Sequence, residues 1–227
     1  MILDGMSFQG SYHAINQDAF KIVKRNNIFV SVISDGLGSL SHSQIGSRAI
    51  CDSVEEFILG NDIDYLFNLK AELWLKKIHD IWISKVGNDI SNCYATFLLF
   101  ACIKDRILTI RLGDGFISIL LKNGSKVLFD KKETYLLNET DCFTEELAID
   151  KVEYFESKKS ELVCFLMSTD GFEIGDMSED IIKEFTKEFA EGNKGLAGEI
   201  IRNDVVSWFS SWTGTDDKTL VYYLGEE

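Results

Sequence analysis

The chain has 227 residues, of which 45% are hydrophobic and 26% are charged, and its formal net charge is −14. This apolar content is sufficient for a buried core and excludes an intrinsically disordered chain. The acidic excess argues against nucleic acid or an anionic membrane surface as a partner. Residues 1–227 show no internal repeat and no linker-like break, so one domain is predicted.

The sequence also indicates a compartment. No signal peptide opens the chain, and no run approaches the roughly 18 uncharged apolar residues that a membrane span requires. The 5 cysteines are scattered without a CxxC pair. Reduced core thiols fit this pattern better than disulfides or zinc ligands, and the predicted location is the cytoplasm.

Taken in chain order, the apolar patterns predict an α+β domain. Asp4-Gly5 is predicted to be a turn, and residues 131–150 a polar excursion with no clear period. Short β-branched and aromatic runs predict strands over residues 19–24, 28–33, 93–103, 107–112, 116–121, 126–129, 152–155, 162–167 and 219–224. Apolar residues at three- and four-residue steps predict helices over residues 45–58, 62–89, 179–189 and 196–209.

Acidic residues recur at the ends of these predicted strands. Asp-Gly pairs at Asp35, Asp114 and Asp170 each follow a β-run, and Asp216-Asp217 stands immediately before the last strand. If these strand ends lie together, several carboxylates converge, and buried carboxylates need water or hard cations beside them. Oxygen ligands without a Cys or His cluster favour Mg²⁺ or Mn²⁺ over zinc. Two such ions sharing a water would lower its pKa and aim it at phosphorus.

The order of the motifs resembles the type 2C metal-dependent serine/threonine protein phosphatases, the PPM family. The resemblance spans nearly the whole chain and implies a four-layer αββα sandwich, with two central antiparallel sheets flanked by helices. The stretches that carry it, in family order and at comparable spacing, are Asn16-Gln17-Asp18-Ala19, Ser34-Asp35-Gly36-Leu37-Gly38-Ser39, Leu112-Gly113-Asp114-Gly115, Ser168-Thr169-Asp170-Gly171 and Asp216-Asp217-Lys218-Thr219.

The resemblance also implies roles for individual residues. Asp35 would bridge two metal ions, and Asp170 and Asp216 would complete one of them. Asp114 would belong to a third, weaker metal position. Asp18 would bind a metal ion directly or through a water molecule. The full implied ligand set is Asp18, Asp35, the carbonyl of Gly36, Asp114, Asp170 and Asp216. The implied activity is hydrolysis of phosphoserine and phosphothreonine by metal-activated water, with a phosphoprotein substrate and a cognate kinase as partners.

The chain departs from the commoner family pattern at two positions. Gln17 stands where many members have an acidic residue, and His13 where many have a phosphate-binding arginine. A Gly-x-x-His opening followed by Gln-Asp-Ala resembles a divergent, bacterial-type branch of the family. A protonated histidine can bind phosphate or donate a proton to the leaving oxygen, so His13 is a predicted catalytic residue beside Asp35. A purely structural His13 is the alternative.

Two other functions compete with an active phosphatase. A catalytically silent phosphatase-like domain could keep the fold as a regulatory binding module, because the arginine is absent and Gln17 replaces an acid. A nucleotide-binding domain is disfavoured, because the Gly36-x-Gly38 turn lacks a third glycine and Asp35 would repel a pyrophosphate.

Overall fold

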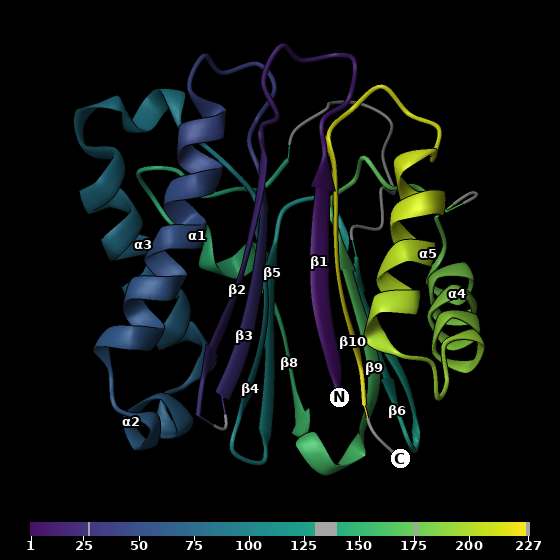
Figure 1. Ribbon diagram of the computed structural model, residues 1–227. Helices are drawn as coiled ribbons and strands as arrows, with labels where there is room; N and C mark the ends of the chain where they lie inside the picture. Colours follow the sequence, from purple (N-terminus) through teal and green to yellow (C-terminus); the bar gives the residue numbers. More distant parts are fainter. Residues whose placement is uncertain (27, 130–139, 175–176, 226–227) are drawn as a thin grey trace.

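Two five-stranded antiparallel sheets pack face to face, and helices cover both outer faces (Figure 1). This computed structural model describes residues 1–26, 28–129, 140–174 and 177–225. The predicted four-layer αββα sandwich is confirmed. Sheet A has the strand order β1-β10-β9-β6-β7, and sheet B has the order β2-β3-β4-β5-β8.

The strands follow the apolar runs closely. In sheet A they are β1 (Ile2–Phe8), β10 (Lys218–Leu224), β9 (Leu162–Ser168), β6 (Phe116–Leu121) and β7 (Gly124–Phe129). In sheet B they are β2 (Asp18–Arg25), β3 (Ile28–Asp35), β4 (Phe97–Ile103), β5 (Arg106–Leu112) and β8 (Glu153–Lys158).

Within the described ranges, three helices cover sheet B and two cover sheet A (Figure 1). The first group is α1 (Ser43–Gly60), α2 (Ile63–Asn68) and α3 (Ala71–Val86), and the second is α4 (Glu179–Gly192) and α5 (Gly198–Ser210). Ser178 caps α4, because Ile181 N donates to Ser178 Oγ at 3.3 Å.

The apolar core consists of three layers. One lies between sheet B and its helices, and it buries Trp74 and Trp82 completely. A second lies between sheet A and α4 and α5. The third lies between the two sheets, where the rings of Phe100 and Phe165 stack with their centroids 3.9 Å apart. All five cysteines are buried and free, as predicted.

Two predicted elements were wrong. Asp4-Gly5 is no turn, because it lies inside β1, where a Cβ on Gly5 would come within 2.8 Å of the Val221 side chain on β10. The single helix predicted over residues 62–89 is divided into α2, α3 and a 3₁₀ turn, Gly87–Asn92. Tertiary contacts at residues 67–69 cause the first break, and sequence periodicity does not record them.

The polar excursion predicted over residues 131–150 lies largely outside the described residues. The part that is described, residues 140–150, includes the fully buried Phe143 and the beginning of a 3₁₀ turn, Ile149–Lys151. None of the helices within the described ranges is long and apolar enough to cross a membrane.

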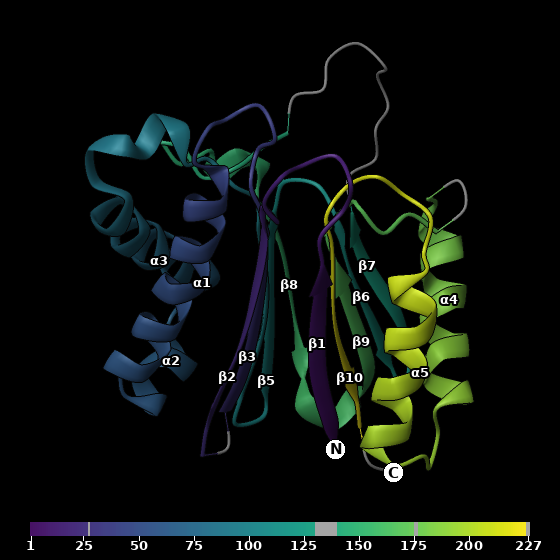
Figure 2. The same cartoon turned by 45° about the horizontal axis from the view of Figure 1, so that its top comes forward.

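Strand ends from both sheets meet at one end of the sandwich (Figure 2). The β1–β2 loop, the β3–α1 turn and the α5–β10 loop lie there together. Asp18, the first residue of β2, is paired in register with Asp35, the last residue of β3. Ser168 at the end of β9 pairs with Leu220 near the start of β10. The fold therefore gathers the acidic strand ends, as the sequence predicts.

Candidate active site

Asp35 is held by its own backbone. Its N–H donates to Thr96 Oγ1 at 2.9 Å, and its carbonyl accepts from Thr96 N at 2.8 Å. The next residue, Gly36, has its N–H on the carbonyl of Gln17 at 3.2 Å. A Cβ on Gly36 would lie 2.6 Å from the backbone of Ser43, so the first turn of α1 packs directly on this turn. The backbone before and after the Asp35 side chain is thus held in place.

Asp18 is buried opposite Asp35, with 5% of its surface exposed. Thr169 Oγ1 donates to Asp18 Oδ2 at 2.8 Å, which links the start of β2 in sheet B to the end of β9 in sheet A. Asp18 Oδ1 is buried and has no hydrogen-bond partner among the described residues. Burying a carboxylate oxygen without a hydrogen-bond partner lowers the stability of the fold, because no other contact replaces the water that the oxygen loses.

Burial and neighbouring charges shift the pKa values of Asp35 and Asp18. Burial raises the pKa of Asp35 well above its usual range, and the charges of Asp18, Asp170 and Asp216 raise it further. Burial likewise raises the pKa of Asp18 to about 7, although the hydrogen bond from Thr169 opposes the rise. The structure therefore brings together four of the predicted ligands, Asp18, Asp35, Asp170 and Asp216.

Asp114 has a different environment. Thr140 Oγ1 donates to Asp114 Oδ2, and the Asp114 charge helps to raise the pKa of the buried Cys142 thiol. The flanking Gly113 and Gly115 both have positive φ, at 104° and 89°, so the turn that carries Asp114 depends on glycine. The predicted third metal position, shared with Asp170, stays a prediction.

Asp217 has a role that the sequence analysis did not assign. It is 3% exposed, and its two carboxylate oxygens accept from Gly10 N at 2.8 Å and Gln17 N at 2.7 Å. These bonds fasten both ends of the β1–β2 loop to the start of β10. The doubled acid in Asp216-Asp217 was the available signal, but partners some 200 positions away cannot be deduced from spacing.

His13 lies in the loop that Asp217 fastens. Its Nε2 is 3.9 Å from Asp216 Oδ1, and its side chain is 16% exposed. A Cβ on Gly38 would lie 3.0 Å from the same Nε2 and 3.6 Å from Gln17 Oε1. Because Gly38 has no side chain, His13 and Gln17, the two residues that depart from the family pattern, both fit against it. His13 thereby lies beside the candidate ligand Asp216.

The donor set suits hard cations, although it is not arranged as a finished metal site. No group of three or more Asp, Glu, His or Cys side chains within the described ranges already has ligating geometry. However, Asp18 has a buried oxygen that lacks a hydrogen-bond partner among the described residues. Burial, together with the charges of Asp18, Asp170 and Asp216, also raises the pKa of Asp35. Oxygen ligands of this kind fit Mg²⁺ or Mn²⁺, whose charge would compensate the repulsion.

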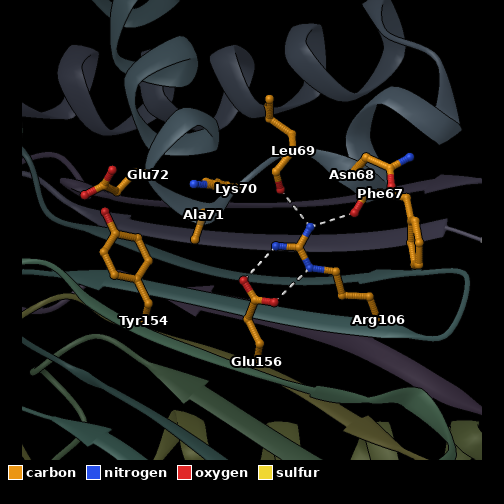
Figure 3. A pocket seen from close by; sticks show the side chains of 9 residues that line it. All are labelled: Phe67, Asn68, Leu69, Lys70, Ala71, Glu72, Arg106, Tyr154 and Glu156. Carbon is orange, nitrogen blue, oxygen red and sulfur yellow. Dashed lines mark hydrogen bonds and ion pairs between the residues drawn. The ribbon is translucent and has the colours of Figure 1, made fainter.

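A cavity of about 610 Å³ lies elsewhere, between the α2–α3 break and strands β5 and β8 (Figure 3). The Arg106 guanidinium at this cavity binds both carboxylate oxygens of Glu156. It also donates to the carbonyls of Phe67 and Leu69, each at 2.8 Å. Since its donors are engaged in holding the end of α2 against sheet B, Arg106 has a structural role here.

His42 and His79 lie outside the carboxylate group. His42 is an exposed residue before α1 and pairs with Asp89 at 2.5 Å. His79 is buried, at 6% exposed, and its Nε2 lies 2.7 Å from the Thr144 carbonyl. Burial lowers the pKa of His79.

Known structures share this architecture. A bacterial serine phosphatase is 15% identical, with a TM-score of 0.73 over 99% of this chain and 98% of that one. The serine/threonine phosphatase Stp1 from Staphylococcus aureus is also 15% identical, with a TM-score of 0.71 over 100% and 96%. RsbX in complex with magnesium is 16% identical, with a TM-score of 0.61 over 96% and 92%.

At the sequence level, no curated protein matches the chain. A family model described as "Protein phosphatase 2C" matches residues 11–210. This match includes most of the β1–β2 loop, all but one of the predicted ligands and both sheets except β1 and β10. The chain belongs to the protein phosphatase 2C family.

Proposed function

We propose that the chain, acting as one catalytic domain over residues 1–227, is a metal-dependent phosphatase that hydrolyses phosphoserine and phosphothreonine in proteins. The observation that carries the proposal is the convergence of four carboxylates at joined strand ends, with Asp18 Oδ1 buried and lacking a hydrogen-bond partner among the described residues. Membership of the protein phosphatase 2C family supports this function.

The ligand roles follow the resemblance. Asp35 would bridge two ions of Mg²⁺ or Mn²⁺, with Asp170 and Asp216 on one of them, and Asp18 close to the pair. Gly36 would contribute its carbonyl, and Asp114 would belong to a third position. Two bound ions would supply an activated water and would stabilise charge on the phosphoryl oxygens. The magnesium reported for RsbX is consistent with this choice of ion.

His13 is the proposed phosphate-binding or proton-donating group. It lies in a fastened loop beside Asp216, and its side chain remains 16% exposed. As a cation it could orient a phosphate, and as an acid it could protonate the departing serine or threonine oxygen.

The proposed substrate is a phosphoprotein. The proposed partner is a kinase, which would add the phosphate group that this chain would remove. Cytoplasmic location is inferred from five buried cysteines, all in the free thiol form.

A silent, regulatory phosphatase-like domain is the second candidate. The observation in its favour is that no group of three or more potential ligands is preassembled within the described ranges. Such a domain would bind a phosphoprotein without releasing phosphate. Metal binding together with turnover separates the two candidates.

Asp35→Asn should abolish turnover while leaving the protein folded. With Mn²⁺ or Mg²⁺, wild-type protein should release phosphate from p-nitrophenyl phosphate, and EDTA should stop the reaction. The variant should lose at least about 10²-fold in kcat, a barrier increase of about 2.7 kcal/mol. Asp204→Asn, an exposed change on α5, is the matched control and should keep wild-type activity. Full activity in EDTA, or a variant with more than about a tenth of the wild-type rate, would contradict the bridging role.

His13→Ala should lower kcat/KM by roughly 10²-fold or more on a phosphoserine peptide. If His13 donates the proton, the loss should be much smaller on p-nitrophenyl phosphate, because nitrophenolate leaves without protonation. His42→Ala, which removes an exposed, ion-paired histidine, is the control and should stay within about twofold of wild type. Equal losses on both substrates would show that His13 binds phosphate instead, and no loss would show a structural residue.

Asp18→Asn should change how the stability of metal-free protein depends on pH. Because the pKa of Asp18 is raised to about 7, its stabilising contribution is complete below the unfolded pKa near 3.8 and is lost as pH rises through 7. In EDTA, the variant should therefore gain stability relative to wild type between pH 4 and pH 8, by at most about 4 kcal/mol. Thermal unfolding at both pH values measures this difference. A difference that does not change with pH would show that Asp18 titrates normally.

A further inference from the structure

Two large apolar side chains project into solvent from the β1–β2 loop. Tyr12 is 75% exposed and Ile15 is 52% exposed, although both lie in a segment whose neighbours are tightly held. Tyr12 has the highest exposed fraction among the large hydrophobic residues of the described chain. Scattered single hydrophobic residues on a surface are ordinary, so exposure alone carries no function. Tyr12 and Ile15, however, lie in a loop beside the candidate active site, and this position is what suggests a function.

The backbone that presents these side chains is fixed. Tyr12 N donates to the Thr215 carbonyl at 2.8 Å, and Gln9 Nε2 donates to the His13 carbonyl at 2.9 Å. The buried Asp217 carboxylate holds the loop further, at Gly10 N and Gln17 N. Charge-assisted hydrogen bonds of this kind are stronger than neutral ones. The loop therefore holds Tyr12 and Ile15 in place before any ligand binds.

The loop is continuous with the candidate active site. A Cβ on Gly10 would lie 2.3 Å from the backbone carbonyl of Asp216, so the loop rests directly on the segment that carries a predicted ligand. The Tyr12 ring meets the His13 ring edge to face, with centroids 4.7 Å apart, and His13 Nε2 is 3.9 Å from Asp216 Oδ1. Figure 2 shows the β1–β2 loop beside the α5–β10 loop at this end of the sandwich.

We propose that Tyr12 and Ile15 are specificity-determining residues that bind apolar side chains flanking the phosphorylated residue of the substrate. This inference rests on the proposed phosphatase function, which it deepens. His13, the neighbour of Tyr12, lies 3.9 Å from Asp216, and an extended peptide advances about 3.3 Å per residue, so a peptide with its phosphate at the carboxylates brings its flanking residues to this loop.

Tyrosine and isoleucine suit such a contact. A tyrosine ring supplies a large apolar surface with few rotatable bonds, so that little conformational entropy is lost on binding. Burying one Leu-sized side chain favours binding by roughly tenfold or more. Because the loop is already ordered, little of the binding free energy from burying this side chain is lost in ordering the loop. Most of it therefore contributes to selectivity between substrates.

The test compares two phosphoserine peptides that differ only beside the phosphoserine, one with Leu and one with Ser at the flanking positions. Phosphate release with Mn²⁺ gives kcat/KM for each peptide, and the ratio of the two values is the readout. The proteins are wild type, Tyr12→Ser/Ile15→Ser and the control Ile200→Ser, which removes an equally exposed isoleucine from α5. Because both peptides use the same catalytic groups, a general loss of activity leaves the ratio unchanged.

Wild type and Ile200→Ser should prefer the Leu peptide by roughly tenfold, and the double variant should bring the ratio to within about twofold of one. If the double variant does not fold, Ile15→Ser alone should lower the ratio about threefold. A wild-type ratio near one, or an unchanged ratio in the loop variants, overturns the inference. If wild type releases phosphate from neither peptide nor p-nitrophenyl phosphate, the proposed function fails and the inference with it. Turnover of p-nitrophenyl phosphate with a ratio near one overturns the inference alone.

Discussion

Repulsion between Asp18 and Asp35 is the constraint on which this structure depends. The two residues are paired across β2 and β3, and burial raises the pKa of each carboxyl. Like charges directly opposite one another destabilise a strand pair, so the fold must be held together here by other means. A cation at this place would relieve the cost, which links the stability of the strand ends to the proposed function.

The compensation comes from contacts between distant parts of the chain. Thr96 holds the backbone of Asp35 on both sides, and Thr169 donates to Asp18 from the opposite sheet. Asp217 fastens the loop that carries His13, while the aromatic layer between the sheets fixes their relative position. Each candidate functional group is therefore placed by a rigid strand end or by a fastened loop, which favours precise positioning.

The β-runs and Asp-Gly turns are local signals, so they predicted an α+β domain with acidic residues at its strand ends. The αββα architecture came from the resemblance to the phosphatase family. The sequence was insufficient where contacts between residues far apart in the chain determine the local structure. Asp4-Gly5 belongs to a strand because Val221 of β10 packs against Gly5, and the 62–89 helix breaks where Arg106 binds the carbonyls of Phe67 and Leu69. Nor could spacing reveal that Asp217 binds Gly10 and Gln17.

The central claim is that the convergent carboxylates form a metal centre. Its most direct test is a crystal structure of the protein soaked with Mn²⁺, with anomalous diffraction measured at the manganese absorption edge. We predict anomalous peaks in contact with the carboxylates of Asp35, Asp170 and Asp216. No peak at these residues at millimolar Mn²⁺, or peaks only at acidic residues elsewhere on the surface, would contradict the account.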